Sequence, residues 1–211
     1  MLLASLFPVL QRLREAGIAT LVLKGAALVV RYYHDIGARE MADADMAVPI
    51  AHLQEAVTIL RGLGWEPVKP PRGGFDGALV GVTHAWTFRD AAARELDLHW
   101  FITRETGLAG LDDMLWGRAV PLSIAGAPTL ALDDTDMLLH LLIHGMRWNP
   151  VAPLRWVADA TTVVGSGSCV DWERLAVGVR LRPSEAERAM LPRLLDPVLR
   201  LRAEVEDPMA P

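Results

Sequence analysis

Two runs of alternating acidic and apolar residues place the strongest limit on how this chain folds. The first is Asp43-Ala-Asp45-Met-Ala-Val48, and the second is Glu95-Leu-Asp97-Leu-His-Trp100. A period of two is typical of a β-strand that buries one face and turns the other towards solvent or a site. Asp43 and Asp45 would then point the same way on one strand, and Asp97 could join them from a neighbouring strand.

Three carboxylates that converge on strand ends indicate a bound cation. They would repel one another unless a positive charge lay between them. A hard divalent ion such as Mg²⁺ takes oxygen ligands and keeps coordination places for substrate phosphates. We therefore expect Asp43, Asp45 and Asp97 to bind magnesium. An isolated Asp-x-Asp pair is more often a solvated strand edge or turn, so this prediction depends on the segment that precedes it.

A candidate phosphate-binding turn lies just upstream of the first acidic run. Residues 19–24 are typical of a buried strand, and we expect a helix at residues 26–34. Backbone N–H groups and the positive end of a helix at such a junction can hold an anion. Gly25 has no side chain, so phosphate oxygens could approach the backbone closely, and Lys24 adds a positive charge beside it.

In this combination and order the chain resembles the DNA polymerase β-type nucleotidyltransferase superfamily. Within it, the chain is similar to a poorly characterised bacterial nucleotidyltransferase family with a Lys-Gly … Arg-x-x-x-Asp-x-Asp signature. The matching segments are Leu23–Leu28, Arg39–Met46 and Leu96–Trp100, with weaker matches at Leu138–His144 and Leu154–Asp159. The resemblance covers most of the chain.

The resemblance implies an enzyme that transfers a nucleoside monophosphate, in the first instance AMP from ATP, to a hydroxyl or similar group. Asp43 and Asp45 would bind Mg²⁺, and Asp97 would complete the site of a second ion and take the proton of the acceptor. The acceptor would be a small molecule or a peptide or protein side chain, and the sequence does not specify which.

The resemblance also implies which residues bind the nucleotide. Gly25 and Ala26 would cradle the β- and γ-phosphates, and Lys24 and Arg39 would contact phosphate. The wider superfamily has a Gly-Ser pair whose hydroxyl contacts a phosphate, and Ala26 replaces that serine here. Two alternatives therefore stay open: a weakly active or inactive module of the same fold that binds a nucleotide or a partner, and a metal-dependent phosphohydrolase that uses the same acids.

The order of elements indicates the α/β (α+β) class. We expect a mixed β-sheet nucleotidyltransferase core with helices against one face at residues 1–130, followed by a helical lobe at residues 131–211; packing of both as one unit is nearly as plausible. Gly17 should end a first helix and Gly64 another. The other expected elements are a strand at 43–48, a helix at 53–63, hairpins at 78–102 and 118–131, and helices at 133–147 and 153–164.

Composition narrows the classes of partner. The net charge of −5 and the absence of a Lys or Arg run argue against a broad nucleic-acid-binding face. No apolar run approaches the roughly 20 residues that cross a bilayer. The lone Cys169 excludes an intrachain disulfide and fits a reducing compartment. We expect a cytoplasmic protein whose partners are an NTP and the acceptor.

Three histidines could contribute to a site. His140 and His144 share a helix face at i, i+4 spacing, but Leu141 follows the first, where a zinc metalloprotease needs glutamate. We slightly favour a structural role for both. His99 lies on the face of Asp97, where contact with a ligand and a structural hydrogen bond are equally compatible with the sequence.

Overall fold

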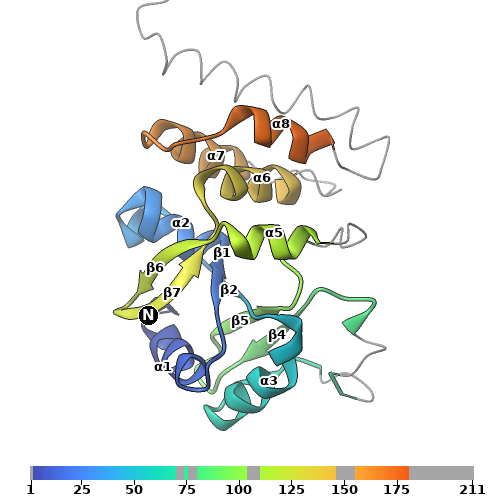
Figure 1. Cartoon of the computed structure of the whole chain (residues 1–211). Coiled ribbons are helices and arrows are strands. Elements are labelled where there is room, and N and C mark those ends of the chain that lie inside the picture. The colour runs from blue at the N-terminus through green and yellow to red at the C-terminus, as the bar shows by residue number, and fades with distance from the viewer. Residues whose placement is uncertain (1, 70–73, 76–79, 104–109, 146–154, 181–211) are drawn as a thin grey trace, which may run out of the picture. The chain divides into compact units, whose positions relative to one another are not determined.

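The structure is a computed structural model that describes residues 2–69, 74–75, 80–103, 110–145 and 155–180. The chain forms two compact units that divide after Leu132. The first contains every described strand, and the second contains the helices α6, α7 and α8 (Figure 1). No helix within the described ranges is long and apolar enough to cross a membrane.

The first unit is built on a sheet of seven strands in the order β3-β4-β5-β2-β1-β7-β6. Its strands are β1 Leu21–Leu23, β2 Asp43–Ala47, β3 Glu66–Pro67, β4 Ala85–Arg89, β5 Glu95–His99, β6 Val120–Ile124 and β7 Ala127–Ala131. The pairs β1/β7 and β2/β5 are parallel, whereas all other neighbours are antiparallel. The predicted mixed sheet of the α/β class is confirmed.

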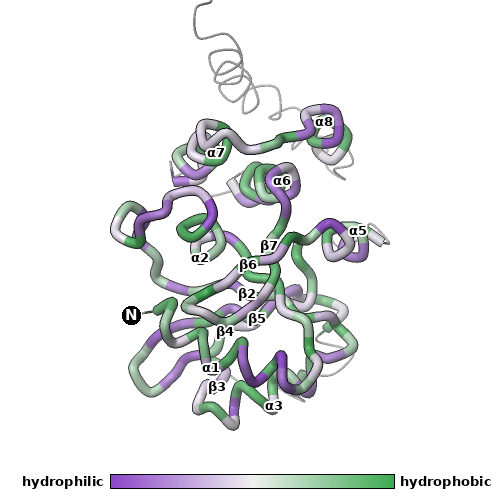
Figure 2. Tube along the Cα trace, turned by 60° about the vertical axis from the view of Figure 1, so that its left-hand side comes forward, coloured by the Kyte–Doolittle hydropathy of each residue, from purple (hydrophilic) through white to green (hydrophobic). Residues whose placement is uncertain are grey.

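One face of the central strands is apolar and fully buried. Met46, Leu96 and Leu98 on this face have no exposed surface. The helices α1 (Leu2–Glu15) and α3 (Leu53–Gly62) pack together on one side of the sheet (Figure 1). Both alternate between hydrophobic and hydrophilic segments, as amphipathic helices do (Figure 2). Burial of this face leaves the acidic positions of β2 and β5 on the other.

Two glycines end these helices as the sequence predicts. Gly17 follows α1 with φ +75° and Gly64 follows α3 with φ +84°. This left-handed conformation costs glycine little, because it has no Cβ. The chain therefore leaves each helix sharply and enters β1 and β3.

A third helix, α5 (Leu111–Gly117), lies on the opposite side of the sheet from α1 and α3 (Figure 1). The expectation of helices against only one face was therefore wrong. The chain has to cross from β5 to β6, which lie four strands apart in the sheet order, and α5 forms part of this crossover.

The junction after β1 is tighter than predicted. The helix α2 (Lys24–Leu28) begins directly at Lys24, whose φ of +43° makes the turn, and continues into a π-helical segment at Val29–Tyr33. A short 3₁₀ turn follows at Ile36–Ala38, and the side chain of Asp35 stabilises it by accepting a hydrogen bond from the Gly37 N–H at 2.8 Å.

Both predicted hairpins form. β4 pairs with β5, although β4 begins only at Ala85; part of the earlier segment lies outside the described residues. β6 and β7 are joined by Ala125 and Gly126, both with positive φ, as a two-residue hairpin turn requires. The first of these hairpins brings β4 beside the acidic positions of β5.

The second unit contains α6 (Asp134–Gly145), α7 (Arg155–Gly165) and α8 (Trp172–Arg180). Asp133 is the N-cap of α6, because its carboxylate accepts a hydrogen bond from the Asp136 N–H at 2.8 Å. Arg174 of α8 lies 2.7 Å from the Asp133 carboxylate, and this ion pair ties α8 to the start of α6. The sequence analysis expects α6 to end at Arg147, and that residue lies outside the described ranges.

Candidate active site

The register of the central strands places the predicted acids on one face of the sheet. Asp45 of β2 lies directly opposite Asp97 of parallel β5, and Asp43 lies opposite Glu95. Directly paired residues point to the same face, as do residues two apart on one strand. Asp43, Asp45 and Asp97 therefore share a face, and His99 joins them two residues beyond Asp97.

Asp45 is the most strongly held of these acids. It is 4% exposed, and its Oδ1 lies 2.5 Å from Lys24 Nζ and 3.0 Å from His99 Nε2. Burial alone would raise the pKa of Asp45, but the hydrogen bond with His99 and the charge of Lys24 outweigh burial and lower it below its usual value. Asp45 is therefore ionised at neutral pH.

Asp43 experiences the opposite balance. Burial raises the pKa of Asp43, the negative charges of Asp45 and Asp97 raise it further, and Lys24 offsets only part of this effect. The carboxylate thus lies in the negative field of the other two acids. A cation at this end of the strands would relieve that repulsion.

Asp97 is oriented by a residue that the sequence analysis did not identify. Thr87 of β4 lies opposite Asp97 in the antiparallel ladder and donates a hydrogen bond from Oγ1 to Asp97 Oδ1 at 2.6 Å. A threonine within a strand carries no signal of this kind by itself. The pairing of β4 with β5 is what brings its hydroxyl to the acid.

The described residues that could hold a metal ion together are Asp45, Asp97 and His99. One potential ligand atom from each lies within 4.8 Å of the others. This set differs from the predicted one, because His99 stands in place of Asp43. The two paired carboxylates, together with the negative field on Asp43, fit a divalent cation that prefers oxygen ligands, with His99 as a further donor or as the partner that orients Asp45.

The predicted phosphate-binding turn has a basic residue packed against it. A Cβ added at Gly25 would collide with Arg39 Nη1 and lie 3.1 Å from the side chain of Met41. The bare glycine therefore lets the Arg39 guanidinium approach the start of α2. Ala26 is fully buried, so its methyl group faces the interior. Lys24 forms an ion pair with Asp45, and Arg39 lies against Gly25, so the chain has two basic residues at the Lys24–Gly25 turn.

The other two histidines that the sequence analysis considered, His140 and His144, belong to the second unit. His140 is buried within α6, and His144 lies in its last turn. In the part of the chain that the structure describes, neither is among the residues that could jointly hold a metal ion. Their structural role stays a prediction.

These features define a class. A strand that turns through Lys-Gly into a helix, beside paired acids on adjacent strands of a mixed sheet, is the architecture of the polymerase β-type nucleotidyltransferases. The chain belongs to the family described as uncharacterised nucleotidyltransferase, whose sequence model matches residues 1–194. The protein is accordingly an enzyme that transfers nucleoside monophosphates.

Solved structures show the same fold. ANT(2″)-Ia in complex with adenylyl-2″-tobramycin is similar with a TM-score of 0.58 and 14% identity, over 90% of this chain and 97% of that one. An antigenic nucleotidyltransferase-like protein from Paracoccidioides brasiliensis reaches a TM-score of 0.58 and 16% identity, over 97% and 92% of the two chains. The lincosamide antibiotic adenylyltransferase LnuA, bound to lincomycin, reaches 0.50 and 12%, over 75% and 93%.

None of the curated proteins is similar enough in sequence to match the chain.

Proposed function

We propose that the protein transfers AMP from ATP, with Mg²⁺, to a hydroxyl or similar group of an acceptor, and that the unit ending at Leu132 carries the reaction. The observation that carries this proposal is the Asp45–Asp97 pair beside Lys24, with Asp43 on the same face. The adenylyl group fits two structural neighbours, one described with adenylylated tobramycin and one as an adenylyltransferase. Both names concern small antibiotics, so a small-molecule acceptor is favoured over a peptide.

Asp43, Asp45 and Asp97 would hold the magnesium. When bound, it would neutralise phosphate charge and align the attacking and leaving oxygens for in-line displacement at the α-phosphorus. Asp97 would accept the proton of the acceptor hydroxyl. At the same time the hydroxyl oxygen would form its bond to the α-phosphorus, and the bond from the α-phosphorus to pyrophosphate would break. Thr87 keeps the Asp97 carboxylate in one orientation for this role.

Lys24 and Arg39 would bind the triphosphate. Lys24 now neutralises Asp45 at 2.5 Å, so a cation at the carboxylates would compete with it for that oxygen. A released Lys24 ammonium would then be available to phosphate oxygens at the start of α2, where Arg39 already lies against Gly25. Positioning and charge neutralisation are the main contributions to such phosphoryl chemistry.

A test follows the labelled nucleotide. The protein is incubated with α-labelled ATP, MgCl₂ and a metabolite extract, and labelled products and pyrophosphate are measured. We expect a labelled acceptor together with pyrophosphate in equal amounts, and loss of both in Asp45→Asn. Glu173→Gln, an exposed acid of α8, is the matched control and should keep full activity. Pyrophosphate without any labelled acceptor would instead identify a phosphohydrolase.

One observation keeps a second candidate in view, a module that binds nucleotide without transfer. Ala26 supplies no hydroxyl, and its methyl group is fully buried, so phosphate binding would depend on backbone groups and on Lys24 and Arg39. Thermal stabilisation by ATP and Mg²⁺ that is lost in Asp45→Asn, with no pyrophosphate release over a broad acceptor panel, would favour this candidate. Release of pyrophosphate with a labelled product would exclude it.

A further inference from the structure

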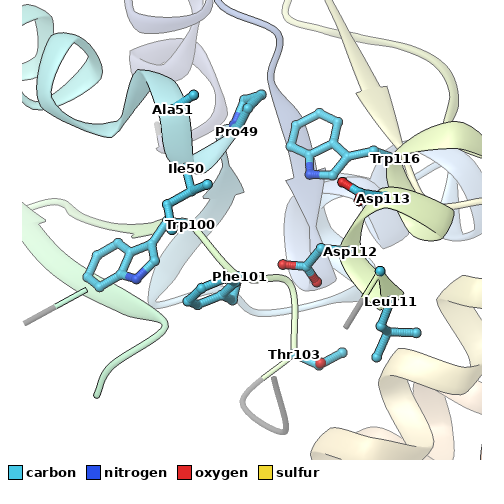
Figure 3. Close-up of a pocket in the computed structure, with 11 residues that line it drawn as sticks. Pro49, Ile50, Ala51, Trp100, Phe101, Thr103, Leu111, Asp112, Asp113 and Trp116 are labelled. Atoms are coloured by element: carbon cyan, nitrogen blue, oxygen red, sulfur yellow. The ribbon is translucent and has the colours of Figure 1, made fainter. Parts of the chain in front are cut away.

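A cavity of about 410 Å³ lies at the carboxyl ends of the parallel strands β2 and β5 (Figure 3). After β2 the chain continues through Pro49–Ala51 into α3, and after β5 it continues through Trp100 towards α5. These two connections leave the sheet on opposite sides (Figure 1). Adjacent parallel strands whose connections diverge in this way open a crevice at their carboxyl ends, which is where open α/β sheets bind ligands. The size also falls in the range of small-molecule sites.

The walls of this crevice combine aromatic rings with acids. Trp100, Phe101 and Trp116 line it together with the carboxylates of Asp112 and Asp113. The side chain of Asp112, at the start of α5, points towards Phe101 (Figure 3). None of the described lining residues is basic. The crevice is thus apolar and negatively charged at once.

Two buried polar atoms in its wall lack a hydrogen-bond partner. Thr103 is 4% exposed, and its Oγ1 has no partner among the described residues; the same holds for Asp112 Oδ2. Asp112 Oδ1, by contrast, accepts a hydrogen bond from the Ile102 N–H at 3.3 Å. A buried acceptor without a donor is costly, and natural folds rarely leave one unmatched. Both atoms are shielded from solvent, so a ligand with N–H donors would reach them once their side chains turn towards the crevice.

We propose that the crevice binds a small organic ammonium compound with an aromatic or flat aliphatic body. The body would lie between Ile50, Phe101 and Trp116, and the ammonium group would face the carboxylates of Asp112 and Asp113. Aromatic faces attract cations, and carboxylates form charge-assisted hydrogen bonds with ammonium groups. An anion would meet two acids and no described basic side chain.

This site is separate from the acids of the proposed reaction. Pro49 follows Asp45 by four residues along an extended chain, which corresponds to about 13 Å at the rise of a β-strand. The row of Asp43, Asp45 and Asp97 contributes no residue to the crevice lining. Asp112 lies within electrostatic reach of His99, which belongs to the set of residues that could hold a metal ion, so binding of an amine is measured without nucleotide or metal.

Three indole probes of different charge test the proposal in the nucleotide-free protein. Tryptamine is the cation, indole-3-acetamide the neutral analogue and indole-3-acetate the anion, and affinities are measured by isothermal titration calorimetry. We expect tryptamine to bind about tenfold more tightly than the amide, because one cation–π contact together with a carboxylate partner contributes about that much affinity. The acetate should bind more weakly than the amide. Equal affinities for all three, or no binding of tryptamine at millimolar concentration, would overturn the proposal.

Two variants locate the binding. Asp113→Asn, at an exposed position, should weaken tryptamine about tenfold and leave the amide unchanged, because it removes one charge and keeps the shape. Trp116→Leu should weaken both probes. Shifts of the indole N–H signals of Trp100 and Trp116 in ¹H–¹⁵N spectra identify the crevice directly, with Glu173→Gln as the folded control. Unchanged tryptamine affinity in Asp113→Asn, or shifts confined to other tryptophans, would place the amine elsewhere and overturn the assignment.

Discussion

The two ends of β2 and β5 hold acids in opposite electrostatic settings. Towards their amino ends, Asp45 has a lysine and a histidine on its oxygen, and Asp97 has the Thr87 hydroxyl. At their carboxyl ends, Asp112 has one backbone N–H, and burial raises its pKa to about 6. The first region therefore holds its charges in place before any ligand arrives, whereas the second leaves an acid that a ligand could satisfy.

The largest expected effect comes from substitutions at the amino ends of β2 and β5, where the acids already have partners. Asp45→Asn and Asp97→Asn each remove a charged oxygen and keep the side-chain shape. We expect nucleotidyl transfer to fall by about a thousandfold or more in each, because charge stabilisation at the reacting phosphate is the main source of rate. Initial rates of pyrophosphate release at saturating ATP and Mg²⁺ measure the loss. Activity within tenfold of wild type in both variants would remove these acids from the reaction.

The next effect comes from removing the partner that neutralises Asp45. Lys24→Ala leaves the buried Asp45 carboxylate with His99 as its hydrogen-bond partner. Breaking a buried ion pair of this kind should lower the free energy of unfolding by about 3 kcal/mol. Urea denaturation at pH 7.5 measures it. Arg12→Ala, which breaks an exposed pair with Glu15, is the control and should change stability by less than about 1 kcal/mol.

The same variant has a pH signature. The pKa of Asp45 lies below its usual value in the folded state, so its ionisation contributes stability above pH 3.8 that is lost as the pH falls. Without Lys24 that pKa should rise, and acid destabilisation should begin at a higher pH than in wild type. Identical acid transitions in the two proteins would show that Lys24 does not stabilise the charge of Asp45.

The two regions also differ in how far the sequence predicts them. Alternating acids in residues 43–48 and 95–100 were enough to predict both strands and a shared face for the three acids. The Lys24–Asp45 contact was missed, because it depends on the pairing of β1 with β2, which no local pattern encodes. The Thr87–Asp97 hydrogen bond lies within a predicted hairpin, but it depends on the register of that hairpin, which was not predicted. The local signal for Lys24 indicated only a basic residue near a phosphate-binding turn.

The crevice was not predicted at all. Sequence analysis assigned no element to Leu111–Gly117, although two acids in a first turn, Asp112 and Asp113, are a helix-start signal. A crevice depends on where the connections after β2 and β5 go, and that is a property of the sheet order. The residues after β2 and those after β5, taken separately, are ordinary apolar and acidic residues, so neither segment alone indicates a crevice.

A smaller effect is expected at the carboxyl ends of β2 and β5, where Asp112 has an oxygen without a partner among the described residues. The folded pKa of Asp112 is about 6 against 3.8 for the unfolded chain, so wild type loses stability as the pH rises from about 4 to 6. Asp112→Asn removes this loss and keeps the acceptor for Ile102. We expect the variant to be more stable than wild type at pH 7.5 by roughly 1 to 2 kcal/mol after allowing for solvent screening, and this advantage to vanish near pH 4.

Thermal or urea unfolding at both pH values measures this difference. Asp113→Asn, at the exposed neighbouring position, is the matched control and should change the pH dependence far less. A destabilised Asp112→Asn at pH 7.5 would mean that the carboxylate already has a partner in solution, and that the contrast between the two ends is smaller than the structure indicates.

The smallest expected effect concerns the hydrogen bond that orients Asp97. Thr87→Val removes the hydroxyl that donates to Asp97 at 2.6 Å and keeps the shape of the side chain. Both side chains are half-buried, so the loss of this hydrogen bond should cost about 1 kcal/mol, which corresponds to roughly a fivefold change. If Thr87 orients Asp97 for magnesium, the Mg²⁺ concentration that gives half-maximal transfer should rise about fivefold in Thr87→Val. If the threonine is purely structural, the variant should be less stable and its Mg²⁺ dependence should be unchanged. Thr87→Ser, which restores the donor, should return the Mg²⁺ dependence to that of wild type.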